Sequence, residues 1–346
     1  MIIILLITLF GQVAFPQASM QGVREGIGLC AKVIIPSLFP FMVCSNLLIK
    51  SKLIRVLNRY LGKFGTAFYV FTVGSLSGYP MGAKCAADLC TRGICSKKEA
   101  EWLLAFCNNC SSLYIIGAVG IGLMGSYRVG VILYISHILS SLILSVLFVA
   151  KGNDKVRNRT QTEPVAEKLD IAESILDSLK QLAKVCGLVL FFSSLTAILG
   201  ETLLKELPIY IKGGLFGLLE ITKGIALISS KPTSAGLIIT SALISFGGVC
   251  VILQTASVVA KAGLSIVKYT TAKLAGAMLS AAITLIMLNL PIGAATVSTV
   301  TTASSSGIVN AFVYSGSLLG FSTLIIPAFL LVSRRLSSKS KQFYNE

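Results

Sequence analysis

Long apolar segments alternate with short polar segments along the chain, and the apolar segments have lengths typical of membrane helices. About 20 consecutive apolar residues form a helix that crosses the hydrocarbon core of a bilayer. Because several segments approach or exceed this length, the pattern predicts an all-α polytopic membrane protein. The expected membrane helices cover residues 1–19, 26–49, 101–124, 129–150, 185–204, 233–262, 264–288 and 308–332.

Two further apolar segments are interrupted by residues that disfavour a continuous helix. Residues 74–84 contain three glycines, a proline and a lysine, and residues 214–229 contain Glu220 and Lys223. Proline removes a backbone donor and glycine weakens a helix. In hydrocarbon, the freed backbone groups need partners in the protein or in a wet cavity. We therefore expect two re-entrant helical hairpins, one in each interrupted segment.

The distribution of Lys and Arg predicts the topology. The net charge is +16, yet 13% of the residues are charged, 54% are hydrophobic and the mean hydropathy is +0.84. The basic residues gather in segments 50–63 and 151–159 and in the C-terminal tail. The positive-inside rule assigns such segments to the cytoplasm. They do not form the basic face of a nucleic-acid-binding domain, so no nucleic-acid partner is expected.

All three basic segments lie on one side of the membrane only if both interrupted segments turn back without crossing. The first hairpin then inserts from the cytoplasm and the second from outside, an inverted repeat of the kind that many secondary transporters share. Residues 2–15 have a second interpretation, a signal peptide cleaved near Ala18. The expected units are residues 1–19 (N-terminal membrane helix), 20–150 (first repeat), 151–180 (cytoplasmic linker and amphipathic helix), 181–290 (second repeat) and 291–346 (last membrane helix and basic tail).

Polar side chains inside the apolar segments are candidates for a binding site. Lys84 lies just past the first hairpin tip, where its ammonium either attracts an anion or pairs with Asp88 four residues later. Asn108, Asn109 and Ser111 place two amides and a hydroxyl within one helical turn. These groups either bind a substrate or a cation, or join neighbouring helices by hydrogen bonds.

The second half of the chain contributes a similar set. Glu220 and Lys223 lie three residues apart and either neutralise each other or make Glu220 a proton or sodium site. The hairpin tips at 77–84 and 220–224 and the helix breaks at 108–111 and 247–254 are expected to form one midplane site. The predicted substrate-binding residues are Ser77, Gly78, Tyr79, Pro80, Gly82, Lys84, Asn108, Asn109, Ser111, Glu220, Thr222, Gly224, Gly247, Gly248 and Gln254.

The nine cysteines and the single histidine do not indicate a metal or enzyme site. The pair Cys107 and Cys110 has no second CxxC pair to join it, and most other cysteines lie in apolar segments as small hydrophobic residues. His137 lies in a predicted membrane helix, where a packed interior role is favoured over that of a ligand. Phosphate-binding loops and a Ser-His-Asp arrangement are also missing from the sequence. We expect no catalysis, metal or cofactor.

Three motifs resemble those of a known family. The segments Pro36-Ser-Leu-Phe-Pro-Phe41, Ser77-Gly-Tyr-Pro-Met-Gly-Ala-Lys84 and Phe106-Cys-Asn-Asn-Cys-Ser111 are similar to motifs of the sporulation integral membrane proteins of the YlbJ (SpoVV) type. These proteins belong to a wider group with a nucleoside-recognition or gate domain. The element from Gly78 to Lys84 is the most specific part of the resemblance. Ser112 and residues 251–253 depart from the family pattern, which has proline and a histidine there.

The resemblance implies a fold similar to that of the concentrative nucleoside transporters, which share opposed hairpins. It also implies a multi-pass protein of endospore-forming bacteria, in the outer forespore membrane. Members of the family are implicated in moving dipicolinic acid from the mother cell toward the forespore. The expected function is therefore secondary-type transport of a small organic anion, with dipicolinic acid as the first candidate.

Two other functions stay open at this stage. One is transport of a nucleoside or another small solute, in which case Lys84 pairs with Asp88 and touches no substrate. The other is a non-transporting membrane scaffold in spore-envelope assembly. The expected partners are the lipid bilayer, a small anionic substrate and H⁺ or Na⁺ as coupling ion, and the basic tail predicts a cytoplasmic C-terminus. The oligomeric state is left open.

Overall fold

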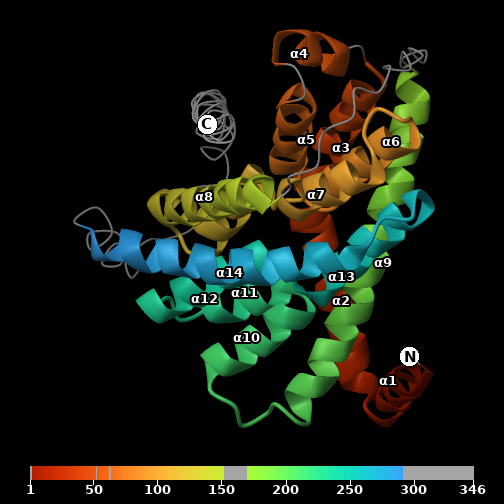
Figure 1. Cartoon of the computed structure of the whole chain (residues 1–346). Coiled ribbons are helices and arrows are strands. Elements are labelled where there is room, and N and C mark those ends of the chain that lie inside the picture. The colour runs from red at the N-terminus through yellow and green to blue at the C-terminus, as the bar shows by residue number, and fades with distance from the viewer. Residues whose placement is uncertain (1, 52, 62–63, 152–169, 291–346) are drawn as a thin grey trace.

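The computed structural model describes residues 2–51, 53–61, 64–151 and 170–290, and within these ranges the chain is helical and contains no strand (Figure 1). Five helical runs in this part are long and apolar enough to cross a membrane, in agreement with the predicted multi-pass protein. Most of the predicted linker, the last membrane helix and the basic tail lie outside the described residues. The five runs are Pro16–Lys50, Tyr127–Val146, Ile171–Glu201, Ser234–Ala262 and Ile266–Asn289.

The helices follow one another with short connections. The first half contains α1 (Ile2–Ala14), α2 (Pro16–Leu29), the π-helical turn η1 (Cys30–Ile34), α3 (Ile35–Lys50), α4 (Leu53–Leu61), α5 (Phe64–Ser77), α6 (Met81–Thr91), α7 (Lys97–Cys107), η2 (Leu113–Leu123) and α8 (Tyr127–Lys151). The second half contains α9 (Ile171–Glu201), α10 (Ile209–Leu219), α11 (Ile221–Ser229), α12 (Ser234–Phe246), α13 (Gly248–Val259), η3 (Ala260–Ala262) and α14 (Ile266–Asn289).

The first long helical run differs from the prediction in its limits. It begins at Pro16 rather than near residue 26, because proline at the first position of a helix loses no hydrogen bond that the helix would make. Pro36 and Pro40 do not end the run. The helix widens to π geometry in η1, directly before Pro36, and the Ser37 hydroxyl donates to the Ile34 carbonyl at 3.2 Å. The helical run therefore continues through both prolines.

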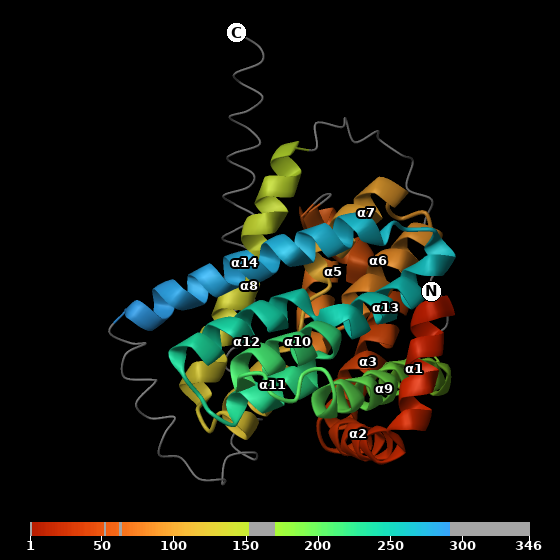
Figure 2. The same cartoon turned by 90° about the horizontal axis from the view of Figure 1, so that it is seen from below.

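Helix α9 packs antiparallel to this run along most of its length (Figures 1 and 2). At one end the hydroxyls of Ser19 and Ser194 lie 2.8 Å apart, and at the other Lys50 pairs with Glu173 at 2.6 Å. The amphipathic helix predicted at the end of unit 151–180 and the membrane helix predicted at 185–204 form one helix of 31 residues. The start of α9 thus lies beside the start of the basic segment 50–63.

Both interrupted segments form helical hairpins. Helices α5 and α6 meet at Gly78, whose φ of 78° is in the left-handed region that favours glycine, and at the cis Tyr79–Pro80 bond. Helices α10 and α11 meet at Glu220 and pack antiparallel, so that the Tyr210 hydroxyl donates to the Lys231 carbonyl at 2.7 Å. The two predicted helix interruptions are therefore confirmed. Their re-entrant insertion and the inverted repeat stay predictions.

The predicted break at 108–111 is present as well, whereas the break predicted at 247–254 is confined to Gly247, because residues 248–254 belong to the continuous helix α13. Helix α7 ends at Cys107 and η2 begins at Leu113, while α12 and α13 are separated by Gly247, whose φ is 85°. Each half therefore contains, in the same order, a hairpin, a broken helix and a long helix. The long helices α8 and α14 pack against each other, and α12 lies along α14 (Figures 1 and 2).

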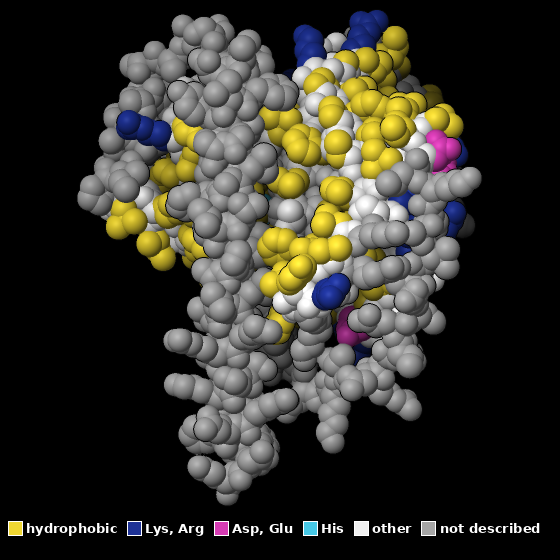
Figure 3. Space-filling model, turned by 90° about the horizontal axis from the view of Figure 1, so that it is seen from above, with side chains coloured by type: hydrophobic (Ala, Val, Ile, Leu, Met, Phe, Trp, Pro, Cys, Tyr) yellow, Lys and Arg dark blue, Asp and Glu magenta, His cyan; other side chains and the backbone are white. Residues whose placement is uncertain are grey.

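The outer surface of the described part is apolar in many places. Met278 and Ile286 on α14 are 76% and 63% exposed. On the face shown in Figure 3, hydrophobic side chains cover much of the described surface between groups of Lys and Arg. Large exposed apolar areas are unfavourable in water and suit contact with lipid. This surface agrees with an integral membrane protein.

The topology can be tested by labelling single cysteines placed at Leu57, Ser96 and Pro208 in a cysteine-free variant. The two-hairpin topology predicts that a membrane-impermeant maleimide labels positions 57 and 96 from the cytoplasmic side and position 208 from the opposite side. In the re-entrant topology no membrane-crossing helix lies between positions 57 and 96. Finding these positions on different sides would therefore refute the re-entrant first hairpin.

Close packing at the first hairpin predicts sensitivity to one added methyl group. A Cβ at Gly74 would overlap the Cys107 carbonyl oxygen, so Gly74→Ala should lower the free energy of unfolding by about 1–3 kcal/mol. The matched control is Gly187→Ala in α9, where nothing lies within 4 Å of the added Cβ. The control should be neutral or stabilising by up to about 1 kcal/mol. Size-exclusion chromatography of heated, detergent-solubilised protein measures both variants, and equal stability would contradict the packing described.

Candidate functional site

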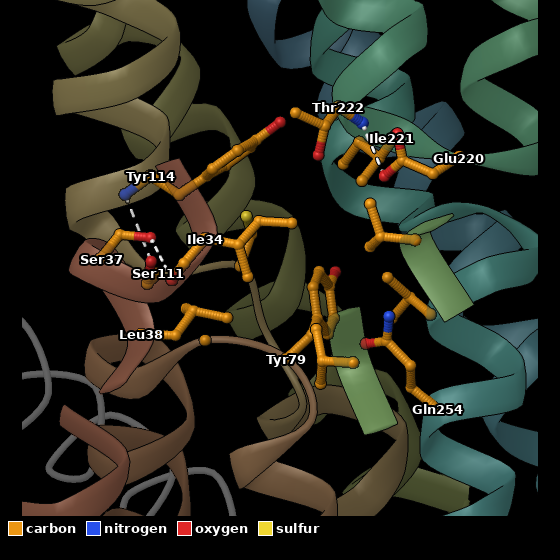
Figure 4. Close-up of a pocket in the computed structure, with 15 residues that line it drawn as sticks. Ile34, Ser37, Leu38, Tyr79, Ser111, Tyr114, Glu220, Ile221, Thr222 and Gln254 are labelled. Atoms are coloured by element: carbon orange, nitrogen blue, oxygen red, sulfur yellow. Dashed lines mark hydrogen bonds between the residues drawn. The ribbon is translucent and has the colours of Figure 1, made fainter. Parts of the chain in front are cut away.

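The helix breaks of both halves surround one cavity of about 60 Å³ (Figure 4). A water-sized sphere occupies about 10–15 Å³ in such a measure, so the cavity has room for only a few water molecules. The first hairpin, the 108–112 break, the second hairpin and α13 each contribute to its wall, and α3 and α9 close it. Its lining residues are Ile34, Ser37, Leu38, Gly78, Tyr79, Cys110, Ser111, Tyr114, Val185, Val189, Glu220, Ile221, Thr222, Val251 and Gln254.

Six of the predicted site residues line this cavity. Tyr79 comes from the tip of the first hairpin and lies between Leu38 and Gln254 (Figure 4). Ser111 lies near Tyr114 and accepts its backbone N–H at 3.2 Å. The remaining four are Gly78, Glu220, Thr222 and Gln254. The cavity thus brings together positions up to 176 residues apart in the sequence, from Gly78 to Gln254.

Glu220 is the acidic residue of the cavity wall. It is 1% exposed, and its two carboxylate oxygens accept the backbone N–H groups of Thr222 at 3.1 Å and Lys223 at 2.8 Å. Glu220 is thus the N-cap of α11, where the helix dipole stabilises a negative charge. The helix interruption that the sequence predicts at this point therefore also positions a buried carboxylate.

Among the described residues the Lys223 ammonium forms its ion pair with Glu25 and not with Glu220, although mutual pairing was one of the two interpretations of these residues. This ammonium lies 3.0 Å from the Glu25 carboxylate and donates to the Ser193 carbonyl at 3.3 Å. Lys223 therefore joins α11 to α2 and α9, and Glu220 is bound by the backbone N–H of Lys223 instead.

Lys84 lies outside the cavity. Its ammonium donates to the side-chain oxygen of Asn46, whose amide in turn donates to the Ser178 hydroxyl at 2.8 Å. The carboxylates of Asp88 and Asp177 act on the same ammonium. This polar cluster connects α3, α6 and α9, and the structure does not bring Lys84 together with the residues that line the cavity.

A buried network of hydrogen bonds lies next to the cavity and is centred on Asn108. Asn108 is fully buried, and its side-chain oxygen accepts the backbone N–H of Ala83 at 3.2 Å. Its amide nitrogen donates to the hydroxyls of Thr255 and Tyr269, both at 3.0 Å. Asn108 therefore joins the start of α6 to α13 and α14.

Asn109 extends the network to α5 and α8. Its nitrogen donates to the Ser75 hydroxyl at 3.3 Å, and its oxygen accepts the Ser141 hydroxyl at 2.9 Å. His137 accepts the Cys110 N–H at its Nε2 atom, at 3.1 Å, and its Nδ1 lies 2.8 Å from the Ser245 hydroxyl. His137 has the packed interior role expected from the sequence, since an accepting Nε2 requires the neutral imidazole.

Lys273 on α14 is not among the candidate residues predicted from the sequence. This lysine is 4% exposed, and its ammonium lies 3.3 Å from the Tyr79 hydroxyl and 3.5 Å from the Asn109 side-chain oxygen. An ionisable residue in the middle of a predicted membrane helix is a functional candidate by default. Applying that rule to residues 264–288 would have found it.

The other predicted site residues build the helix breaks rather than line the cavity. The Ser77 hydroxyl bonds to the Ser45 hydroxyl and joins the first hairpin to α3. A Cβ at Gly82 would overlap the Cys107 carbonyl, and one at Gly224 would overlap the backbone of Gly217. The residues with this structural position are Ser77, Pro80, Gly82, Gly224, Gly247 and Gly248. Within the described residues, no group of three His, Cys, Asp or Glu side chains is placed to hold a metal.

One curated protein is clearly similar to the chain. It is the sporulation integral membrane protein YlbJ of Bacillus subtilis (strain 168), with 27% identity over 76% of this chain and 76% of the relative. This similarity confirms the resemblance that the three sequence motifs predicted. No family model and no solved structure matches the chain.

The Asn108 network predicts the effect of removing its amide. Asn108→Ala leaves the Ala83 N–H and two hydroxyls without their partner, and an unsatisfied buried polar group costs about 1–3 kcal/mol. We expect a clear loss of thermal stability in detergent for this variant. Asn289→Ala, at the exposed end of α14, is the control and should be close to wild type. Equal melting temperatures for the two variants would contradict the structural role of the network.

Proposed function

Because the chain is similar to the sporulation integral membrane protein YlbJ, we propose that it is a secondary-type transporter of a small organic anion. Dipicolinic acid, moved from the mother cell toward the forespore, is the first candidate substrate. The proposal includes two re-entrant hairpins in an inverted repeat, a place in the outer forespore membrane and a cytoplasmic C-terminus. A sporulation-related integral membrane protein is the part that the relative and the apolar helices already support.

The observation that carries the proposal is the cavity between the helix breaks. Four interrupted elements from the two halves of the chain meet there, and each turns polar groups or backbone toward the same space (Figure 4). Transporters form their substrate sites from such discontinuous helices, because broken helices supply polar groups at a depth where regular helices do not. A scaffold has no need of polar groups arranged around an internal space.

The size of the cavity indicates how transport would proceed. Sites for small organic molecules have volumes of about 300–1,000 Å³, so a cavity of about 60 Å³ must widen before an aromatic dicarboxylate fits. Tyr79 and Glu220 lie at the tips of the two hairpins, and movement of either tip would enlarge the space. Alternate movement of the two tips would open it to one side of the membrane and then to the other.

A neutral solute such as a nucleoside is the second candidate, and one observation favours it. Among the described residues neither Lys nor Arg lines the cavity, whereas the carboxylate of Glu220 does. Amide, hydroxyl and carboxyl groups from Gln254, Thr222 and Glu220 suit the hydrogen-bonding pattern of a neutral polar molecule. Competition between dipicolinate and nucleosides for uptake separates the two candidates.

Glu220 is the proposed site of the coupling proton or sodium ion. It is a buried carboxylate, and it lines the cavity where the substrate would lie. Binding of H⁺ or Na⁺ would neutralise its charge and reduce its repulsion of an anionic substrate. Uptake of the anion would then be linked to entry of the cation.

The test is uptake of labelled dipicolinate by proteoliposomes that contain the full chain, with an imposed proton or sodium gradient. The wild type should accumulate dipicolinate, and Glu220→Gln should lose the dependence on the gradient and about tenfold or more of the rate, since it removes a charge but keeps a hydrogen-bond acceptor for the helix cap. Glu173→Gln is the control, because Glu173 lies at the exposed end of α9.

Two outcomes would overturn parts of this proposal. Gradient-dependent uptake that is unchanged in Glu220→Gln would remove Glu220 from the coupling mechanism. Absence of uptake of both dipicolinate and nucleosides by correctly inserted wild-type protein would reject transport and favour the scaffold.

A further inference from the structure

Lys273 occupies an unusual position at the centre of the molecule. It lies in α14 and is 4% exposed, and its ammonium is 3.3 Å from the Tyr79 hydroxyl and 3.5 Å from the Asn109 side-chain oxygen. The same nitrogen lies 5.1 Å from the ring centroid of Tyr79 and 5.7 Å from that of Tyr269. Its surroundings are a phenol oxygen, an amide oxygen and two aromatic faces.

These partners stabilise a positive charge without neutralising it. Aromatic faces and amide oxygens attract an ammonium through their quadrupoles and dipoles, but none of them carries a negative charge. Among the described residues no carboxylate forms an ion pair with Lys273, whereas Lys50, Lys223 and Lys268 each pair with a glutamate. The other titratable groups nearby are Cys107, Cys110 and His137.

The ammonium is separated from the cavity by one side chain. Tyr79 lines the cavity, and its hydroxyl donates to the Ile244 carbonyl at 3.2 Å. Since that bond uses the phenol proton, the oxygen lone pairs of Tyr79 accept from Lys273. Cys110, which also lines the cavity, lies within electrostatic reach of the same ammonium. A shift of the first hairpin tip that moves Tyr79 would bring the cavity and the ammonium together.

We propose that Lys273 is the residue that selects anions: a substrate carboxylate takes the place next to Tyr79 and pairs with the Lys273 ammonium. This inference rests on the proposed transport function and adds the residue that determines the charge of its substrate. It assigns to Lys273 the task that the sequence suggested for Lys84, whose ammonium is bound by Asn46 away from the cavity.

The experiment compares three ligands that share one shape and differ in charge. They are pyridine-2,6-dicarboxylate, its monoamide and its neutral diamide, and their binding to the purified full chain is measured by calorimetry. For the wild type, affinity should fall at least about tenfold at one or both steps of the series, as expected for loss of a charge-assisted hydrogen bond. Wild-type protein that prefers the diamide would overturn the inference without any variant.

The variants locate the charge. Lys273→Gln keeps hydrogen-bonding groups near Tyr79 and Asn109 but removes the charge, and it should lower dicarboxylate affinity at least about tenfold while diamide affinity changes less than about threefold. Lys273→Met is the second variant. Lys268→Gln is the matched control on the same helix, since Lys268 pairs with Glu101 and its side chain is 56% exposed.

The outcomes separate this inference from the proposed function. Unchanged dicarboxylate binding in Lys273→Gln, or equal loss of all three ligands in a variant that remains folded, would overturn the role of Lys273 alone. In that case dipicolinate uptake by the wild type would still stand. Wild-type protein that neither binds nor transports any of the three compounds would reject anion transport, and the role of Lys273 with it.

Discussion

Hydrogen bonds between the helix breaks connect the two halves of the chain. Where a helix ends inside an apolar protein, its free backbone groups need partners, because no bulk water reaches them. Here the breaks supply partners to one another. Asn108, at the end of α7, accepts the Ala83 N–H at the start of α6, and the Tyr79 hydroxyl of the first hairpin donates to the Ile244 carbonyl near the end of α12. These bonds join the first hairpin to α7 and to α12.

The cavity is a consequence of this arrangement. Tyr79 belongs both to the hydrogen-bonded network and to the cavity wall, so widening the cavity by moving Tyr79 would also break bonds to α12. Buried polar groups that lose their partners destabilise the protein unless another group replaces them. A substrate with carboxylate and aromatic groups could provide that replacement. Binding of the substrate and opening of the site would then be linked through the same set of hydrogen bonds.

The charged residues near the breaks have three different environments. Lys223 is neutralised by Glu25, Lys84 lies in a polar cluster with Asn46, and Lys273 has uncharged partners. Glu220 is stabilised by the N-terminus of α11. A charge that a neighbour neutralises contributes little to attraction of a ligand, whereas a charge held by dipoles keeps its field. The environment of each charge, rather than its distance along the chain from a glycine motif, therefore decides which residue can select a substrate.

The sequence alone determined that the protein is helical and membrane-embedded and where its helices break, because apolar length, glycine, proline and charge act locally. It also carried the motifs that predicted the similarity to YlbJ. Only the tertiary structure decided which breaks meet: it placed Tyr79, Ser111, Glu220 and Gln254 around one cavity and left Lys84 outside. It also gave Lys273 its position beside Tyr79. Such contacts join residues nearly 200 positions apart, and they depend on how whole helices pack, which no local pattern of residues contains.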